Sequence, residues 1–352
     1  MVDAFLQTAS NRRNTMLQVD NRTPFAALLS VFPAPSGVET AYGAVKITYD
    51  LSTGRPVPSP RQAGFLAADV YWADPAESSL RAAGDVTLLK PSTDVMLIGR
   101  AVSITGPVPA MDVRMQVGSV QQALRVTGDR VWLRDGKAWR VSEPLPFDRM
   151  PLRWEFAFGG SSPADPNHPL ENEPRNPVGR GFVASWETEL EGRPLPNIED
   201  PGNLMTTPYD RPTPVGFAPL APAWLGRRQY AGTYDAAWQK GRAPHLPLDF
   251  DPRFLHAAPS TLVPARRFVG GEPVALHGVA ASTLAFDLPT PDVELAFDFA
   301  GAEIAAEAHL DTILFEPDLA RMQMVWRAPL VVDKRLLKLK RFQVSNPRGA
   351  RR

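Results

Sequence analysis

The chain has 352 residues, of which 44% are hydrophobic and 22% charged, and these proportions are typical of folded globular proteins rather than disordered chains. Its 38 basic and 38 acidic side chains cancel, which excludes a global field that would attract nucleic acid or an anionic membrane. The absence of cysteine excludes disulfides, thiolate nucleophiles and cysteine-type zinc sites, and it fits a reducing compartment.

Residues 1–20 are predicted to be a variable N-terminal extension. They include Asp3, Arg12 and Arg13 and lack the apolar stretch of a signal peptide, so export by the Sec pathway is not expected. No apolar run approaches the roughly 20 residues that a membrane-spanning helix needs. We therefore expect a soluble, cytoplasmic protein that binds neither membrane nor nucleic acid.

Residues 21–141 are predicted to form an N-terminal β lobe. Residues 45–49 and 112–117 alternate apolar and polar side chains, as half-buried strands do. The pairs Gly118-Ser119 and Asp135-Gly136 separate short β-prone runs, and Asp-Gly is typical of a type I′ hairpin turn in which both residues have positive φ. The pattern predicts an antiparallel meander.

Residues 142–264, the proline-rich segment, hold 21 of the 37 prolines and half of the eight tryptophans. Proline fixes φ and removes a backbone donor, so long helices and central strands are not expected here. Bulky side chains such as Trp154, Phe182 and Trp238 need burial, which argues against a disordered linker. We expect an ordered, irregular segment packed against a lobe.

Residues 265–344 return to alternation and are predicted to form a C-terminal β lobe with a second antiparallel sheet. Residues 293–299 and 322–326 each place large apolar side chains on one face. The basic tail, residues 345–352, is expected to be a solvated chain end, because no aromatic residues are interleaved with its charges.

Helical periodicity is scarce along the chain. Short helices are expected only near residues 77–83, 234–240 and 334–340. The sequence therefore predicts a mainly β fold, with two antiparallel β-sandwich-like lobes that the Pro/Gly-rich segment joins and covers.

Searches for catalytic chemistry find no local motif. The five histidines, which are His168, His245, His256, His277 and His309, form no metal-ligand spacing and are expected to be structural. The sequence has neither the G-x-S-x-G elbow nor a phosphate-binding glycine loop. We predict a protein that is not an enzyme, with no catalytic, cofactor-binding or metal-binding residues.

One enzymatic alternative remains open at this stage. Glu171 and Glu173, together with Asp200, could act as paired carboxylates in the hydrolysis of glycan or peptidoglycan. The opposing interpretation is that these carboxylates cap turns or form ion pairs in loops. Only the arrangement of the side chains in space separates the two.

The most informative residues lie in four stretches of the proline-rich segment that resemble specified turns. Asn before Pro and Gly beside Arg restrict the backbone, while arginine forks can clamp carboxylates or loop carbonyls. These residues either hold the segment to its own lobe or contact a partner. They are Glu173, Arg175, Asn176, Gly179, Arg180, Gly181, Phe182, Pro196, Asn197, Asp200, Tyr234, Asp235 and Trp238.

A set of motifs in fixed order carries a family resemblance over nearly the whole chain after residue 20. Besides the four stretches, it includes Asn21-Arg-Thr-Pro-Phe25, Lys90-Pro-Ser-Thr-Asp94, Gly128-Asp-Arg-Val-Trp132, Met150-Pro-Leu-Arg-Trp-Glu155, Phe158-Gly-Gly160, Leu248-Asp-Phe-Asp251, His256-Ala-Ala-Pro259, Gly271-Glu272 and Trp326-Arg327. With these motifs the chain resembles a type VI secretion accessory family, a domain of unknown function whose members are commonly encoded beside VgrG spike proteins, PAAR-repeat tips and toxic effectors.

The resemblance implies an adaptor or chaperone-like role and supplies no catalytic residues. Its expected partner is a PAAR-repeat protein, an effector toxin or the VgrG spike, which it would stabilise and help to load. An immunity protein that blocks a toxin is a further alternative. No oligomeric state is predicted.

Overall fold

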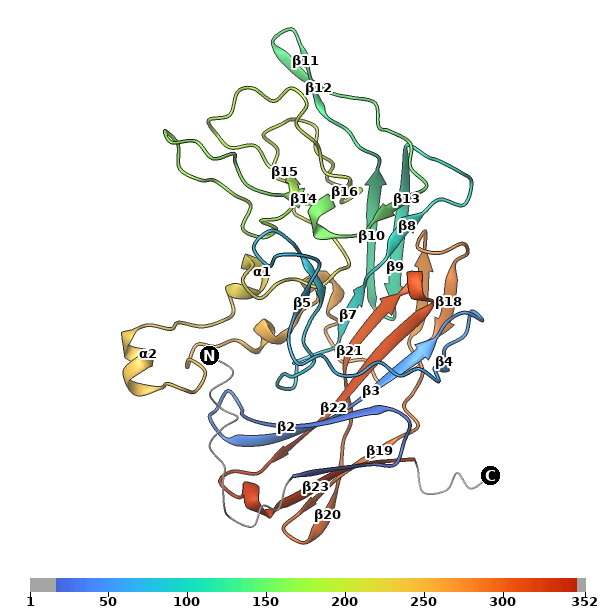
Figure 1. Ribbon diagram of the computed structural model, residues 1–352, viewed down its shortest axis with the longest axis vertical. Helices are drawn as coiled ribbons and strands as arrows, with labels where there is room; N and C mark the ends of the chain where they lie inside the picture. The colour runs from blue at the N-terminus through green and yellow to red at the C-terminus, as the bar shows by residue number, and fades with distance from the viewer. Residues whose placement is uncertain (1–16, 347–352) are drawn as a thin grey trace.

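The computed structural model describes residues 17–346 and shows a mainly β protein, as the sequence predicts. Three larger sheets and four two-stranded ribbons account for the strands, and the described residues contain two short α-helices (Figure 1). None of the described helices is long and apolar enough to cross a membrane.

A six-stranded sheet lies at the centre of the molecule. Its strand order is β2-β3-β22-β21-β7, with β4 paired to the end of β3. The strands are β2 (Ala26–Pro33), β3 (Glu39–Asp50), β4 (Val57–Pro58), β7 (Asp94–Leu97), β21 (His309–Glu316) and β22 (Arg321–Val331). All neighbours are antiparallel except β21 and β7, which run parallel.

A five-stranded sheet and a four-stranded sheet lie beside the central one, above and below it in Figure 1. The five-stranded sheet has the order β16-β10-β9-β17-β18 and comprises β9 (Ala110–Val117), β10 (Val120–Thr127), β16 (Ile198–Glu199), β17 (Pro273–His277) and β18 (Leu284–Asp287). The four-stranded sheet has the order β1-β23-β19-β20 and comprises β1 (Gln18–Asn21), β19 (Glu294–Phe299), β20 (Ala302–Ala306) and β23 (Leu339–Ser345).

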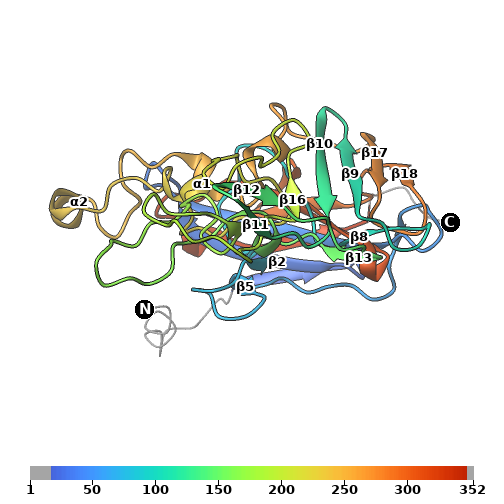
Figure 2. The same cartoon turned by 90° about the horizontal axis from the view of Figure 1, so that it is seen from above.

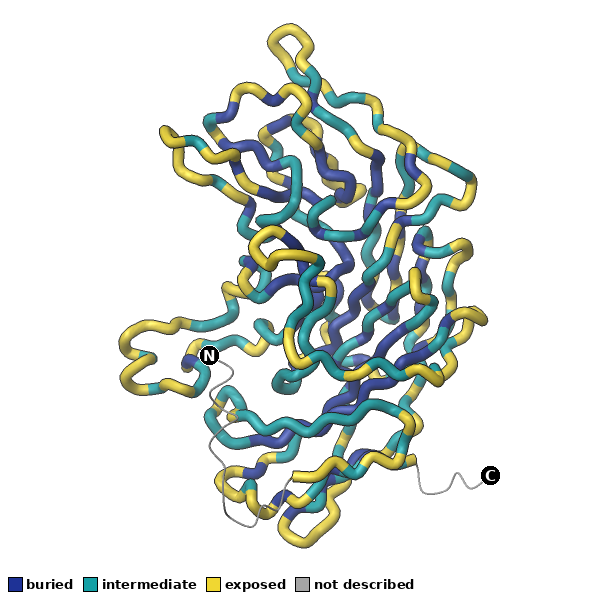
Figure 3. The backbone as a smooth tube through the Cα atoms, viewed as in Figure 1, coloured by how far each residue is buried: buried dark blue, intermediate teal, exposed yellow. Residues whose placement is uncertain are grey.

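The remaining elements are short. The ribbons are β5 (Val70–Tyr71) with β6 (Leu80–Ala82), β8 (Arg100–Val102) with β13 (Arg149–Pro151), β11 (Trp132–Asp135) with β12 (Ala138–Val141), and β14 (Phe158–Gly159) with β15 (Arg180–Gly181). The α-helices are α1 (Leu225–Arg228) and α2 (Ala236–Gly241), and the 3-10 turns are η2 (Trp154–Phe156), η3 (Pro252–Leu255), η4 (Ser260–Leu262), η5 (Pro317–Leu319) and η6 (Leu336–Lys338). Figure 2 shows α2 projecting beyond the sheets, and Figure 3 shows that its segment is largely exposed.

One apolar core joins the three larger sheets. Phe342 of β23 stacks near Phe297 of β19, with ring centroids 5.1 Å apart, and its ring lies directly over Gly43 of β3. Any side chain at Gly43 would overlap that ring, since an added Cβ would come within 2.2 Å of it. A second, smaller apolar cluster under the proline-rich segment contains Trp132, Phe158 and Phe182.

The alternating strands of the sequence analysis are confirmed. Residues 45–49 lie in β3, 112–117 in β9, 294–299 in β19 and 322–326 in β22. The Asp-Gly hairpin also forms, between β11 and β12, but its turn lies one residue later than predicted. Asp135 pairs with Ala138, so Gly136 and Lys137 form the loop, and only Gly136 has positive φ.

The predicted short helices are partly wrong. Residues 234–240 contain the start of α2, whereas residues 80–82 form strand β6, and residues 334–340 give one 3-10 turn before β23. Both strands lie against partner strands, and this long-range pairing overrides local helix propensity.

The N-terminal and C-terminal segments share sheets instead of forming one sheet each. Strand β3 pairs with β22 over eleven residues, and β9 pairs with β17. Residues 18–20, assigned to the variable extension, belong to β1, which pairs parallel to β23. Most of the predicted basic tail, residues 347–352, lies outside the described residues, as do residues 1–16.

Candidate functional site

The turn-forming part of the proline-rich segment is organised around Asn176, whose side chain is fully buried. Its Nδ2 donates to the carbonyl oxygens of Trp154 and Phe158, at 2.8 and 2.9 Å, and its own carbonyl accepts from the Gly160 amide at 2.9 Å. One side chain thus serves backbone groups on both sides of η2 that no sheet serves. Asn176 holds the loop to its own lobe.

Glu173 and Arg175 form a closed pair beside it. Glu173 is 5% exposed, and Arg175 donates to both of its carboxylate oxygens at 2.6 Å. Burial would raise the pKa of the Glu173 carboxyl, but the Arg175 bonds outweigh it and hold that pKa below its ordinary value. Glu173 is therefore a charged clamp at neutral pH.

Arg180 and Asn197 connect the segment to strand β10. Arg180 donates through Nε to the Glu155 carbonyl and through Nη1 to Asn197 Oδ1, both at 3.0 Å. Its guanidinium carbon lies 4.4 Å from the ring centroid of Phe156. Asn197 in turn donates to the carbonyl of Thr127, at the end of β10, at 3.0 Å. These contacts bind the chain to itself.

The approach of the loops requires glycine at Gly181. Its φ is +92°, and an added Cβ would lie 2.6 Å from Cδ of Pro196. Gly179 is equally restricted, because a Cβ there would come within 2.4 Å of Nδ2 of Asn176. The next residue, Phe182, is buried in the smaller apolar cluster.

The structure does not bring the other predicted residues to this place. Asp200 is exposed and accepts from the Gly202 amide in a local turn. Tyr234, Asp235 and Trp238 belong to the projecting α2 segment: Asp235 caps the helix through the Trp238 amide at 2.8 Å, and the two rings meet edge to face at 4.8 Å. Tyr234 is 53% exposed there.

The carboxylates of the hydrolase alternative are likewise engaged in loop contacts. Glu171 accepts from the hydroxyl and amide of Ser185, and these bonds lower the pKa of its carboxyl. Glu171 and Glu173 thus have lowered pKa values, the opposite of the raised pKa that a general acid needs. Asp200 lies in its separate turn.

A site that the sequence analysis did not predict lies on one face of the central sheet. The opposite face of this sheet packs into the apolar core, yet this one also carries buried polar side chains: Lys46 and Thr48 of β3, and Gln323 and Arg327 of β22. Burying such groups costs free energy unless each is paired, so their concentration under a covering segment marks a functional-site candidate.

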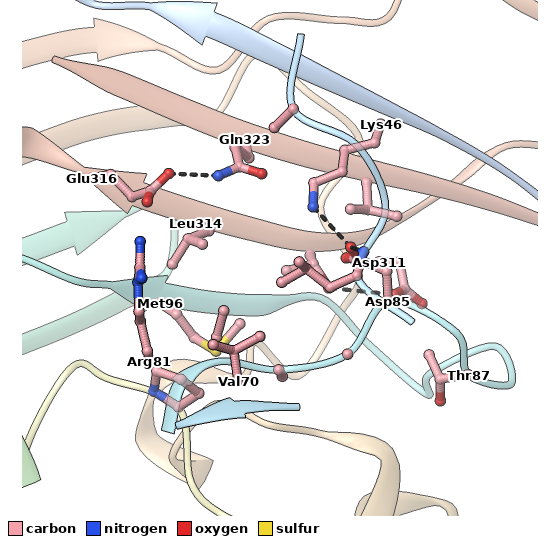
Figure 4. A pocket seen from close by; sticks show the side chains of 18 of the residues that line it. Lys46, Val70, Arg81, Asp85, Thr87, Met96, Asp311, Leu314, Glu316 and Gln323 are labelled. Carbon is pink, nitrogen blue, oxygen red and sulfur yellow. Dashed lines mark hydrogen bonds and ion pairs between the residues drawn. The ribbon is translucent and has the colours of Figure 1, made fainter. Parts of the chain in front are cut away.

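Asp85 fastens the covering segment, residues 59–90, to this face. Its carboxylate accepts from Lys46 Nζ at 2.8 Å and from the Leu66 amide at 2.7 Å, and its carbonyl accepts from Arg327 Nη2 at 2.7 Å. Between the segment and the sheet remains a pocket of about 310 Å³, here called the polar pocket. Figure 4 shows Lys46 and Gln323 on its sheet wall and Val70 and Arg81 on the opposite wall.

A buried charge cluster lies at one end of the polar pocket. Lys90 donates to Asp94 at 2.8 Å and lies 3.5 Å from Asp311, which Arg327 approaches at 3.5 Å from its other side. Asp94 also accepts from His256 Nδ1 at 2.6 Å. All of these side chains except His256 are at most 6% exposed. Two nitrogens of Arg327, Nε and Nη1, lack a hydrogen-bond partner within the described structure.

The cluster keeps its carboxylates ionised. Burial would raise the pKa of Asp94, but Lys90 and His256 hold that pKa far below its ordinary value. Burial acts in the same direction on the pKa of Asp311, which Lys90 and Arg327 lower. Burial would lower the pKa of Lys90, yet the two carboxylates raise it.

A signal for the cluster was present in the sequence. Lys90 to Asp94, His256 to Pro259 and Trp326-Arg327 are three of the motifs that carry the family resemblance, and the fold brings them together across more than 200 residues. Periodicity could not connect them, because they lie on separate strands and loops. Within the described residues, no group of three metal-ligating side chains is placed to hold a metal ion.

Comparison with known proteins gives one match. The family described as "Uncharacterized protein conserved in bacteria (DUF2169)" matches residues 36–327, which include both the proline-rich segment and the polar pocket. Neither the search of curated proteins nor the search of solved structures found a match.

Proposed function

Since the chain belongs to the bacterial family DUF2169, we propose that it is a cytoplasmic adaptor of type VI secretion. In this role it binds a PAAR-bearing or effector protein, stabilises it and aids its loading onto the VgrG spike. The family description names no function, so the proposal draws on the ordered motifs set out above and on one feature of the fold.

That feature is the open edge of the central sheet at strand β2. Its eight residues, Ala26–Pro33, contain no charged side chain, and its register with β3 is regular along its whole length. Among residues 17–346, β2 has a strand partner on one side only. The other side presents backbone donors and acceptors that an extended peptide can satisfy.

The other sheet edges carry features that discourage pairing. At the far edge of the same sheet, β7 is buried, and the amide of its last residue, Leu97, donates to Phe217 of the proline-rich segment. Edge strands β1, β18 and β20 include Asp20, Asp287 and Glu303. Because β2 lacks charge, bulge and cover alike, it is the edge best suited to adding a partner strand.

The proline-rich segment has a different part in this proposal. Its arginines and asparagines bond inward, so they set the shape of the lobe, while the uncharged edge supplies main-chain recognition. An extended stretch of the partner with alternating apolar residues fits β2, because side chains of a strand point alternately to the two faces of a sheet.

Co-purification tests the proposal. The tagged protein is expressed with the effector or PAAR protein of a neighbouring gene, and both recovery and level of that partner are measured. Leu28→Lys places a charge on β2 at a side chain outside the apolar core, and we expect it to reduce recovery at least tenfold. Ala285→Lys, on exposed edge strand β18, is the matched control and should leave recovery unchanged.

The outcomes separate the alternatives. If the partner neither co-purifies nor accumulates to a higher level, the adaptor proposal fails. Full binding by the Leu28→Lys variant would show that β2 is not the surface used. An immunity protein would instead protect cells that make the toxin alone, whereas an adaptor increases delivery of the toxin.

A further inference from the structure

The polar pocket has an asymmetric charge balance. Each of its three lining carboxylates has a cation within reach: Asp85 has Lys46 at 2.8 Å, and Asp311 has Lys90 at 3.5 Å. The third, Glu316, is held by Arg321, which donates to both of its oxygens. These pairs neutralise one another and offer no net charge to a ligand.

Arg81 is the cation left over. It lines the pocket from β6, is exposed, and has no carboxylate partner among the described residues. Its guanidinium carbon lies 5.6 Å from the ring centroid of Trp72, and Arg153 lies over the same ring at 3.5 Å. A second guanidinium close by makes this end of the pocket more positive and more favourable for an anion.

Much of the remaining lining is apolar. Leu66, Val70, Met96, Leu314 and Pro219 contribute from the covering segment, from β5, β7 and β21, and from the proline-rich segment. The volume of about 310 Å³ is at the small end of the range for ligand pockets. An occupant therefore has a short aliphatic body and one negative charge near Arg81.

We propose that the polar pocket binds a carboxylate attached to a short aliphatic group, with Arg81 as its anion-recognition residue. Two sources share this chemistry: a small free carboxylic acid, and the C-terminal carboxylate of a peptide that ends in an aliphatic residue. The planar guanidinium suits either, since it can donate two parallel hydrogen bonds to one carboxylate. This inference is independent of strand addition at β2.

Ligand-observed NMR titration of the full chain tests it. The free-acid arm compares hexanoate with hexanamide, which keeps the aliphatic body and lacks the charge. The peptide arm compares a tetrapeptide ending in Leu-Leu with its C-terminal amide. We expect the charged member of at least one pair to bind at least tenfold more tightly than its neutral counterpart.

Arg81→Gln should weaken that binding at least tenfold without loss of folded protein, because the side chain is exposed. Arg114→Gln is the control, since Arg114 is 67% exposed on β9 and does not line the pocket. The arm that responds identifies the source of the carboxylate. Absence of binding in both arms, equal binding of charged and neutral ligands, or unchanged binding by Arg81→Gln would each overturn the proposal.

Discussion

Replacement of Asp94 by Asn tests whether the buried charge cluster holds the fold together. The carboxylate accepts from His256 through Oδ1 and from Lys90 and the Ala257 amide through Oδ2. An amide of the same volume has a single acceptor oxygen, so its NH2 group must face at least one of these donors. Lys90 would then keep only the 3.5 Å contact to Asp311.

Breaking a buried ion pair by removing one partner costs about 3–5 kcal/mol, because the other charge stays buried. That is a large share of the stability of about 5–15 kcal/mol typical of folded proteins. We therefore expect Asp94→Asn to lower the urea midpoint strongly, measured by tryptophan fluorescence at pH 7.

The matched control for this experiment is Asp112→Asn. Asp112 pairs with Arg125 at 3.0 Å on the surface, with side chains 38% and 42% exposed, and such pairs contribute up to about 1 kcal/mol. Equal midpoints for the two variants would refute the reasoning, since the buried cluster would then contribute no more than a surface pair.

Three further predictions concern the loops and pH. Arg180→Ala should lower the free energy of unfolding by about 2 kcal/mol, since it removes two charged hydrogen bonds, and Glu294→Ala on an exposed strand position should not; urea titration of both compares them. Gly181→Ala should cost about 1–3 kcal/mol in the same assay, because its φ is positive and Pro196 blocks the Cβ. The pKa of Asp94 is lower in the folded state than the ordinary value of about 3.9, so its stabilisation is complete above that pH and declines as the pH falls below it. Urea midpoints from pH 7 to pH 3 should therefore decline less steeply for Asp94→Asn than for the unsubstituted chain.

The strands were predictable where one face is apolar and the other polar. In β9, Val113, Met115 and Val117 are buried while Asp112, Arg114 and Gln116 are exposed, as alternation implies. Sheet membership was not predictable, because β3 meets β22 only through a contact that spans most of the chain. Local periodicity carries no information on such pairing.

The polar pocket was missed for a related reason. On β22, Gln323 alternates with Met322 and Met324, a pattern that indicates a solvated face, yet Gln323 is 6% exposed. Residues 59–90 cover this face, and nothing in the period of β22 encodes a second layer from elsewhere in the chain. The predicted turns of the proline-rich segment fared better, because glycine and proline act on their own backbone.

The β2 edge and the polar face belong to one sheet, and its register relates them. Leu28 of β2 pairs with Ala44 of β3, and Ala44 pairs with Arg327 of β22, so their side chains form one row on the same face. A partner strand beside β2 would extend this row by one residue. Arg327 is fixed at its other end by Asp311 and the Asp85 carbonyl, two groups that also line the polar pocket. A charge at Leu28 should therefore impair strand addition without disturbing carboxylate binding at Arg81, and the paired measurements on Leu28→Lys and Arg81→Gln assign each activity to its own end of the sheet.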